Sequence, residues 1–186
     1  MEKKLSHEEL LKRLLEIAID PFTSVEQKHD IRKIMETSTN FKGKNHLFLV
    51  QCYFNETDPL FTVTKAQAIT QAKLAFKEHN LYSCYYLYFL LKDSEPVQAR
   101  NFLRICCDNA FPNAYLEMAK CRHKGILFEK NDDIAFENYS KAALCGLEEG
   151  YYGMLLIASE KGDKEKTKEI YESAKEKGFI LPGIVE

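Results

Sequence analysis

The amino-acid sequence predicts an all-α fold in which about five antiparallel helical hairpins stack into an α-solenoid. Three observations lead to this fold class. Hydrophobic residues make up 45% and charged residues 29% of the 186 residues, proportions typical of a folded globular protein. Long segments mix charged and apolar residues without strand-like alternation, and the chain has only eight glycines and five prolines, which favours helices. Similar helix junctions also recur along the chain.

Ten helices are expected, and their ends carry local signals. Capping boxes, in which a hydroxyl and a carboxylate or amide satisfy backbone N–H groups, are predicted at Ser6, Thr23 and Thr64. Further N-caps are predicted at Ser94, Asp132 and Asp163, and Gly146, Gly162 and Gly178 are predicted to end helices. The expected helices span residues 6–19, 24–37, 44–54, 64–79, 82–92, 95–109, 113–124, 133–145, 148–161 and 164–177.

The junctions between hairpins resemble one another. The stretches FKEHNLYSCYYLYF, CCDNAFPNAYLEMA and AALCGLEEGYYGML align without gaps, so that Cys84, Ala114 and Gly150 share one position. Asn80, Ala110 and Gly146 share another in this alignment. Small residues at such sites would let one helix lie close to its neighbour. Self-similarity of this kind, with a spacing of 36 residues between Ala114 and Gly150, indicates a solenoid of helical hairpins.

One unit carries a more specific pattern, whose members are Ala114, Met118, Gly125, Phe128, Ala135, Tyr139, Lys141, Ala142, Ala143 and Gly146. This unit resembles a Sel-one-like repeat, a relative of the tetratricopeptide repeats. It departs from the pattern of that family at Leu127, where a second loop glycine is usual, and at Asn138. The resemblance implies a single right-handed solenoid domain over residues 1–186. Within it we expect two degenerate hairpins in 1–80, three repeats in 81–178 and an apolar tail in 179–186, which either folds over the last hairpin or docks on a partner.

Several functional classes are disfavoured by composition and motif content. The formal net charge of −2 and the pI of about 6.2 leave no broad basic surface for nucleic acid. The N-terminus does not read as a signal peptide, and no apolar run is long enough to span a membrane. From these two observations we expect a cytoplasmic protein. Six cysteines without a CxxC spacing indicate buried, reduced thiols.

No catalytic, cofactor-binding or metal-binding motif is present, and we expect a protein that is not an enzyme and needs no cofactor. The five histidines are scattered. Cys121 and His123 are two residues apart, so they point to different sides of a helix and cannot share a ligand.

The resemblance implies a concave groove lined by the first helix of each hairpin, which binds a peptide or helix of a partner protein. The positions carried over to this groove are Tyr86, Asn113, Leu116, Lys120, His123, Glu149 and Tyr152, and they also include Ser83, Leu90, Leu156 and Ser159. Tyr86 and Tyr152 are expected to be apolar anchors, whereas Tyr151 is expected to pack inside.

The function predicted on this basis is that of a non-catalytic adaptor or scaffold for protein–protein interaction. Three alternatives stay open: a dedicated chaperone or immunity-type partner protein, a structural protein that self-associates through its ends and tail, and an enzyme that uses a cysteine.

Overall fold

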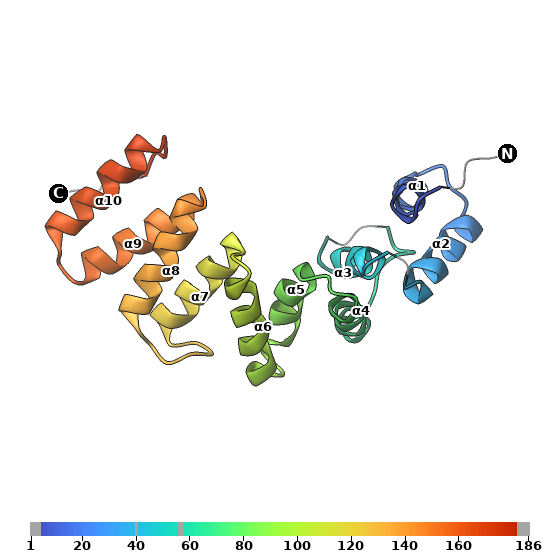
Figure 1. Cartoon of the computed structure of the whole chain (residues 1–186), viewed down its shortest axis with the longest axis horizontal. Coiled ribbons are helices and arrows are strands. Elements are labelled where there is room, and N and C mark those ends of the chain that lie inside the picture. Colours follow the sequence, from blue (N-terminus) through green and yellow to red (C-terminus); the bar gives the residue numbers. More distant parts are fainter. Residues whose placement is uncertain (1–4, 40, 56–57, 182–186) are drawn as a thin grey trace. The chain divides into compact units, whose positions relative to one another are not determined.

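The computed structural model describes residues 5–39, 41–55 and 58–181, and in these residues it contains ten α-helices and no strand (Figure 1). Every predicted helix boundary lies within two residues of the observed one. The chain divides into two compact units, Met1–Glu95 and Pro96–Glu186, which are described separately. The helices are α1 (His7–Ile19), α2 (Val25–Thr37), α3 (Lys44–Asn55), α4 (Lys65–Lys77), α5 (Tyr82–Leu91), α6 (Pro96–Asp108), α7 (Pro112–Lys124), α8 (Asp132–Leu144), α9 (Glu148–Glu160) and α10 (Lys164–Glu176).

Helix starts follow the predicted capping chemistry with local shifts. The capping boxes at Ser6 and Thr64 are confirmed, and so is the N-cap Asp163. The capping box predicted at Thr23 is wrong by one residue. The Ser24 hydroxyl accepts a hydrogen bond from the backbone N–H of Gln27, and the Gln27 side chain accepts one from the backbone N–H of Ser24. Asp132 is likewise wrong as the N-cap of α8, since Asn131 accepts the N–H of Ile134 instead. Ser94 lies two positions before α6 and so is not adjacent to it.

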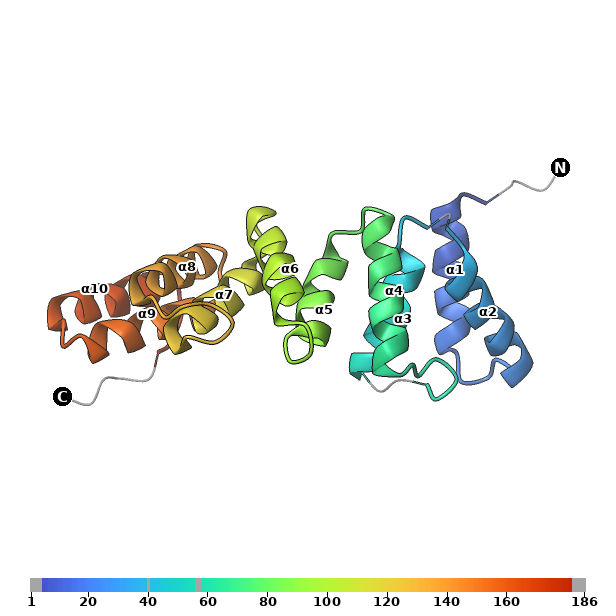
Figure 2. The same cartoon turned by 90° about the horizontal axis from the view of Figure 1, so that it is seen from below.

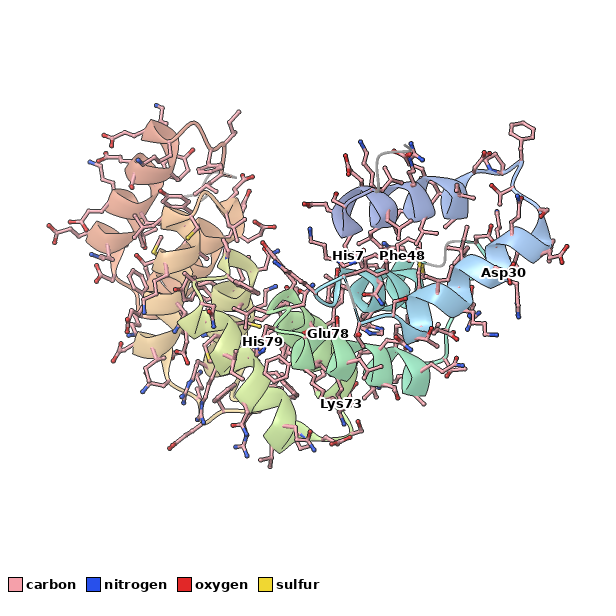
Figure 3. All side chains as sticks on the ribbon, turned by 45° about the vertical axis from the view of Figure 1, so that its right-hand side comes forward. His7, Asp30, Phe48, Lys73, Glu78 and His79 are labelled. Carbon is pink, nitrogen blue, oxygen red and sulfur yellow. The ribbon has the colours of Figure 1, made fainter. Side chains whose placement is uncertain are left out.

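In the first unit, α1, α2 and α3 pack around a core formed by Ala18, Ile31, Met35, Leu49, Cys52 and Phe61, and α4 packs between α3 and α5. Phe48 on α3 (Figure 3) packs against this core and meets the ring of Phe61 edge-on, with ring centroids 5.7 Å apart. Buried polar bonds tie the helix ends together. The side-chain amide of Asn45 donates to the carbonyls of Met35 and Ser38 at 2.7 and 2.8 Å. Such bonds offset the cost of burying an amide.

The second unit places α8 between α7 and α9, and these three helices lie side by side in Figures 1 and 2. Its core includes Ala142 and Ala143 of α8 and Tyr151 and Ile157 of α9. The close approach predicted at Gly150 is confirmed, because a Cβ there would lie 2.5 Å from the backbone nitrogen of Ala143. Gly153 makes a second close approach that the sequence did not reveal, since its Cβ would lie 2.3 Å from the ring of Tyr139.

Helix ends share one geometry, which corrects the predicted alignment at the first junction. His79, Ala110 and Gly146 all have positive φ, at 62°, 56° and 88°. The next N–H after each donates back to the carbonyl five residues earlier, at 3.0–3.1 Å, as in a Schellman motif. His79 therefore occupies the position that the ungapped alignment gave to Asn80. A Cβ at Gly146 would meet nothing within 4 Å, so the glycine there serves the backbone conformation and not a close helix contact.

The described part of the tail folds back on the last hairpin. Leu181 is 3% exposed and belongs to the core of the second unit. Phe179 packs on Tyr151 with ring centroids 5.5 Å apart, whereas Ile180 is 90% exposed. Packing of the tail is thus seen for Phe179 and Leu181, and residues 182–186 lie outside the described residues.

Gly150→Ala tests the close contact between α8 and α9. Alanine is favoured over glycine in a helix by about 1 kcal/mol, but the added methyl would press on backbone atoms that cannot move away independently. We expect the clash to outweigh the helix propensity and to lower the free energy of unfolding by about 1–3 kcal/mol. Urea denaturation measures this, with Glu149→Ala as the control, because Glu149 is the exposed neighbour on the same helix. Equal stability of the two variants would contradict the close contact.

Candidate functional site

Helix α9 presents a narrow exposed strip next to a buried face. Gly150, Tyr151 and Gly153 are buried, whereas Tyr152 is 38% and Leu156 49% exposed. The split follows from the helix period, since positions three and four residues apart share one face. The prediction that Tyr151 packs inside is confirmed. Glu149 and Ser159 are also exposed, so the strip combines two apolar side chains with polar ends.

Helix α7 contributes unequally to the predicted set. Asn113 and Lys120 are exposed, and the ammonium group of Lys120 lies 2.9 Å from the Glu117 carboxylate. Leu116 is 6% exposed and belongs to the core. Asn113 and Lys120 are therefore accessible to a partner, whereas Leu116 packs in the core and is not.

His123 is a buried residue that joins three elements. Its Nδ1 lies 2.8 Å from Oδ1 of Asp132 at the start of α8, and its Nε2 lies 3.7 Å from Oε1 of Glu160 at the end of α9. The hydrogen bond from His123 is the main cause that lowers the pKa of Asp132, with help from the charges of Lys130, His123 and Lys161 and against the effect of burial. His123 thus links α7 to α8 and α9, and we call the contacts of His123 with Asp132 and Glu160 the His123 joint.

Tyr86 belongs to the first unit and is half-buried there. Its hydroxyl accepts a hydrogen bond from Nε2 of Gln51 on α3 at 3.2 Å. Its ring lies 5.4 Å from the ring of Phe54, measured between centroids. Tyr86 thus packs against α3, with part of its surface exposed.

Three arginines that sequence reasoning did not select gather around the loop between α7 and α8. The guanidinium carbons of Arg104 and Arg122 lie 5.5 and 4.8 Å from the ring centroid of Phe128. Arg100 donates to the carbonyl of Leu127 at 3.4 Å. Leu127 replaces the usual glycine of the resembled repeat and adopts φ +62°, a conformation that is unfavourable for a side chain with Cβ. The spacing of Arg100 and Arg104, four residues apart on α6, is the sequence signal for this cluster.

The cysteines show little sign of activation. All six lie in the described segments and form no disulfide; Cys145 is exposed, Cys107 half-buried and the others buried. Burial is the main cause that raises the pKa of the Cys107 thiol to about 12, and the charge of Asp108 adds to it. A thiol with such a pKa is a poor nucleophile at neutral pH. No group of three or more His, Cys, Asp or Glu side chains within the described ranges could hold a metal ion.

Comparison with solved structures shows the fold of Sel-one-like repeat (SLR) proteins. A protective antigen present in uropathogenic Escherichia coli strains, which displays an SLR fold, matches 82% of this chain with a TM-score of 0.67 and 19% identity. A Sel1 repeat protein from Oxalobacter formigenes matches 84% of this chain with a TM-score of 0.54 and 13% identity. This chain spans 34% of the length of the first and 57% of the second. No family model and no curated protein matches the sequence.

The predicted fold class is therefore confirmed: the described residues are all-α, and the chain has the fold of SLR solenoid proteins. None of the helices in the described residues is long and apolar enough to cross a membrane.

Asp132→Asn tests the joint at His123. Because the folded-state pKa of Asp132 lies below its ordinary value of 3.8, the carboxylate adds stability above that value and loses this contribution as the pH falls through the lower pKa. We expect the variant to lose about 1 kcal/mol at neutral pH, since the side chain is partly exposed, and to show a shallower loss of stability in acid. Urea denaturation, repeated from neutral pH down to values below the ordinary pKa of Asp132, measures both effects.

Asp133→Asn is the matched control. The Asp133 side chain is 90% exposed and bonds Lys161 at 2.7 Å, so its loss should change stability by less than about 0.5 kcal/mol. Equal effects of the two variants at all pH values would contradict a structural role for the His123 joint.

Thiol labelling tests the state of the cysteines. At neutral pH the folded protein should react with iodoacetamide at Cys145 alone, because Cys145 is exposed and the Cys107 thiol is protonated. Mass spectrometry of the intact chain should show one modification, which is lost in Cys145→Ser, and all six thiols should react in urea. Modification of Cys107 as fast as Cys145 would contradict this and favour a cysteine-dependent enzyme.

Proposed function

We propose that this protein is a non-catalytic interaction module, an adaptor or scaffold that binds a peptide or helix of a partner protein along the exposed faces of α7 and α9. The observation that carries the proposal is the exposed pair Tyr152 and Leu156 on a helix whose other face is buried. Polar side chains of Asn113, Lys120 and Glu149 on the same two helices are exposed as well. Aromatic anchors bordered by polar groups are typical of protein-binding surfaces.

The energetics of the strip suit recognition of a segment. Tyr152 and Leu156 are 38% and 49% exposed, so a partner that covered them would gain about 1 kcal/mol from each. The hydroxyl of Tyr152 already bonds the carboxylate of Glu148 at 3.3 Å. The side chain is therefore partly ordered before binding, and less entropy would be lost when a partner packs on it.

The state of the thiols supports a role without covalent catalysis in a reducing compartment. Four of the six cysteines are buried, and the half-buried Cys107 has a strongly raised pKa. Reduced, buried cysteines are usual in cytoplasmic proteins. We therefore propose a cytoplasmic scaffold that works without cofactor, metal or nucleic acid.

Lys120→Ala combined with Tyr152→Ala tests the proposal. The tagged protein is used for affinity capture from its native host, and captured proteins are identified by mass spectrometry. A partner so identified is then purified and titrated against both forms by calorimetry. We expect at least a tenfold weaker affinity for the double variant, because truncating an aromatic anchor at an interface commonly costs about 1–2 kcal/mol or more.

Lys168→Ala combined with Glu172→Ala is the control, since both side chains are exposed on α10. Helical circular dichroism should be the same for all forms. Unchanged affinity of the Lys120/Tyr152 double variant would refute binding along α7 and α9. Capture of a single neighbouring gene product would indicate a dedicated partner protein, and capture of a second copy of this chain would indicate self-association.

A further inference from the structure

The arginine cluster of the second unit consists of Arg100 and Arg104 on α6 and Arg122 on α7. All three surround the loop that joins α7 and α8, which is drawn in yellow-orange in Figure 1. Arg104 and Arg122 each lie over the Phe128 ring, which is 6% exposed. Arg100 and Arg122 bond carbonyl oxygens of the loop, those of Leu127 and Glu129, at 3.4 and 3.3 Å.

In the described residues, none of these three arginines forms an ion pair with a carboxylate. Within the described part of the chain, no carboxylate oxygen lies within 4.0 Å of any of the three guanidinium groups. Arg32 in the first unit provides a contrast, because its Nε lies 2.9 Å from the Glu36 carboxylate. In addition, Nε of Arg122 is buried and has no hydrogen-bond partner. Because this nitrogen is inaccessible to solvent, it does not itself contact a partner segment.

The carboxylates nearest in sequence are engaged elsewhere or exposed to solvent. Asp132 bonds His123 and lies 3.7 Å from Lys130, and Glu117 bonds Lys120. Asp108 and Glu129 are exposed. Residues 95–133 contain six lysines and arginines and six acidic residues, so the segment as a whole carries no excess charge. Within the described residues the positive charge is therefore confined to the three guanidinium groups, which no carboxylate oxygen approaches within 4.0 Å.

We propose that Arg100, Arg104 and Arg122 form a binding site for the carboxylate side chains of an acidic peptide segment in a partner protein. A guanidinium group has five N–H donors in a planar fork that matches a carboxylate. The bonds to the loop use Nη1 of Arg100 and Nη1 of Arg122, whereas Arg104 is exposed and can offer its fork to a partner. Stacking on Phe128 holds two of the guanidinium planes in place, which reduces the entropy lost on binding.

Charge complementarity identifies the occupant as an acidic peptide and not a nucleic acid. Three cations can neutralise only a few phosphates, whereas tight nucleic-acid binding depends on neutralising many of them. The site uses none of the residues of the strip on α9, so it stands independently of the proposed function.

The test measures binding of a fluorescein-labelled octaglutamate peptide to the full chain by fluorescence anisotropy, with octaglutamine as the uncharged reference. We expect octaglutamate to bind at low salt and octaglutamine not to bind. Arg100→Gln combined with Arg104→Gln should weaken octaglutamate binding at least tenfold, which corresponds to about 1.4 kcal/mol. Added salt should weaken binding to the unmodified protein more than to this variant.

Lys168→Gln combined with Lys175→Gln is the matched control, because it removes the same charge from exposed positions on α10 and should bind as the unmodified protein does. Arg104→Lys keeps the charge but loses the fork, so it should bind octaglutamate less tightly than the unmodified protein. Where the double variant does not fold, Arg104→Gln alone serves, since Arg104 is exposed and its contact shown here is the stacking on Phe128.

Three results would overturn the proposal. The first is equal or absent binding of octaglutamate and octaglutamine. The second is octaglutamate binding that the arginine variants leave unchanged or that the lysine control loses equally. The third is tighter binding of a single-stranded oligonucleotide with the same number of charges, which would replace the acidic peptide as occupant. Partner capture that persists through any of these results would leave the proposed function intact.

Discussion

The second unit depends on the close contact between the backbones of α8 and α9. Gly150 lies against Ala143, and Gly153 lies against the ring of Tyr139, so that neither glycine has room for a side chain. This contact fixes which side of α9 faces inward: Tyr151 and Ile157 enter the core, and Tyr152 and Leu156 are left outside. The exposed strip proposed for partner binding is therefore a consequence of how tightly the two helices pack, since a wider spacing would permit other rotations of α9.

Hydrogen bonds from side chains hold the loop between α7 and α8 in place. The loop between α7 and α8 is held from both sides, by His123 bonding Asp132 and by Arg100 and Arg122 bonding loop carbonyls. Leu127 can adopt its unfavourable positive φ because these neighbours hold the loop in that conformation. The same loop carries Phe128, on which the guanidinium groups stack. Structural support and the proposed carboxylate site thus use the same arginines through different N–H groups.

Sequence patterns predicted the features that depend on near neighbours in the chain. Helix boundaries and the terminating Gly146 follow from local propensity and helix period, and the inward Tyr151 follows from the resemblance to the repeat. The N-cap of α2 was misplaced because Thr23 and Ser24 are adjacent hydroxyl residues, and only the turn geometry decides between them. The position of His79 was missed because positive φ there has no glycine to mark it. The burial of His123 was missed because its neighbours come from α8 and α9, and no local pattern reveals contacts between helices.

The two proposed surfaces of the second unit differ in the forces that act on them. Tyr152 and Leu156 offer apolar area, whose contribution to binding is insensitive to ionic strength or increases with excluded salts. Arg100, Arg104 and Arg122 offer charge, whose reach is limited to about 8 Å at physiological ionic strength. For any partner of both surfaces, the apolar strip would contribute to affinity at all salt concentrations, whereas the arginines would discriminate against neutral or basic segments. The salt dependence of affinity therefore separates the two contributions for any one partner.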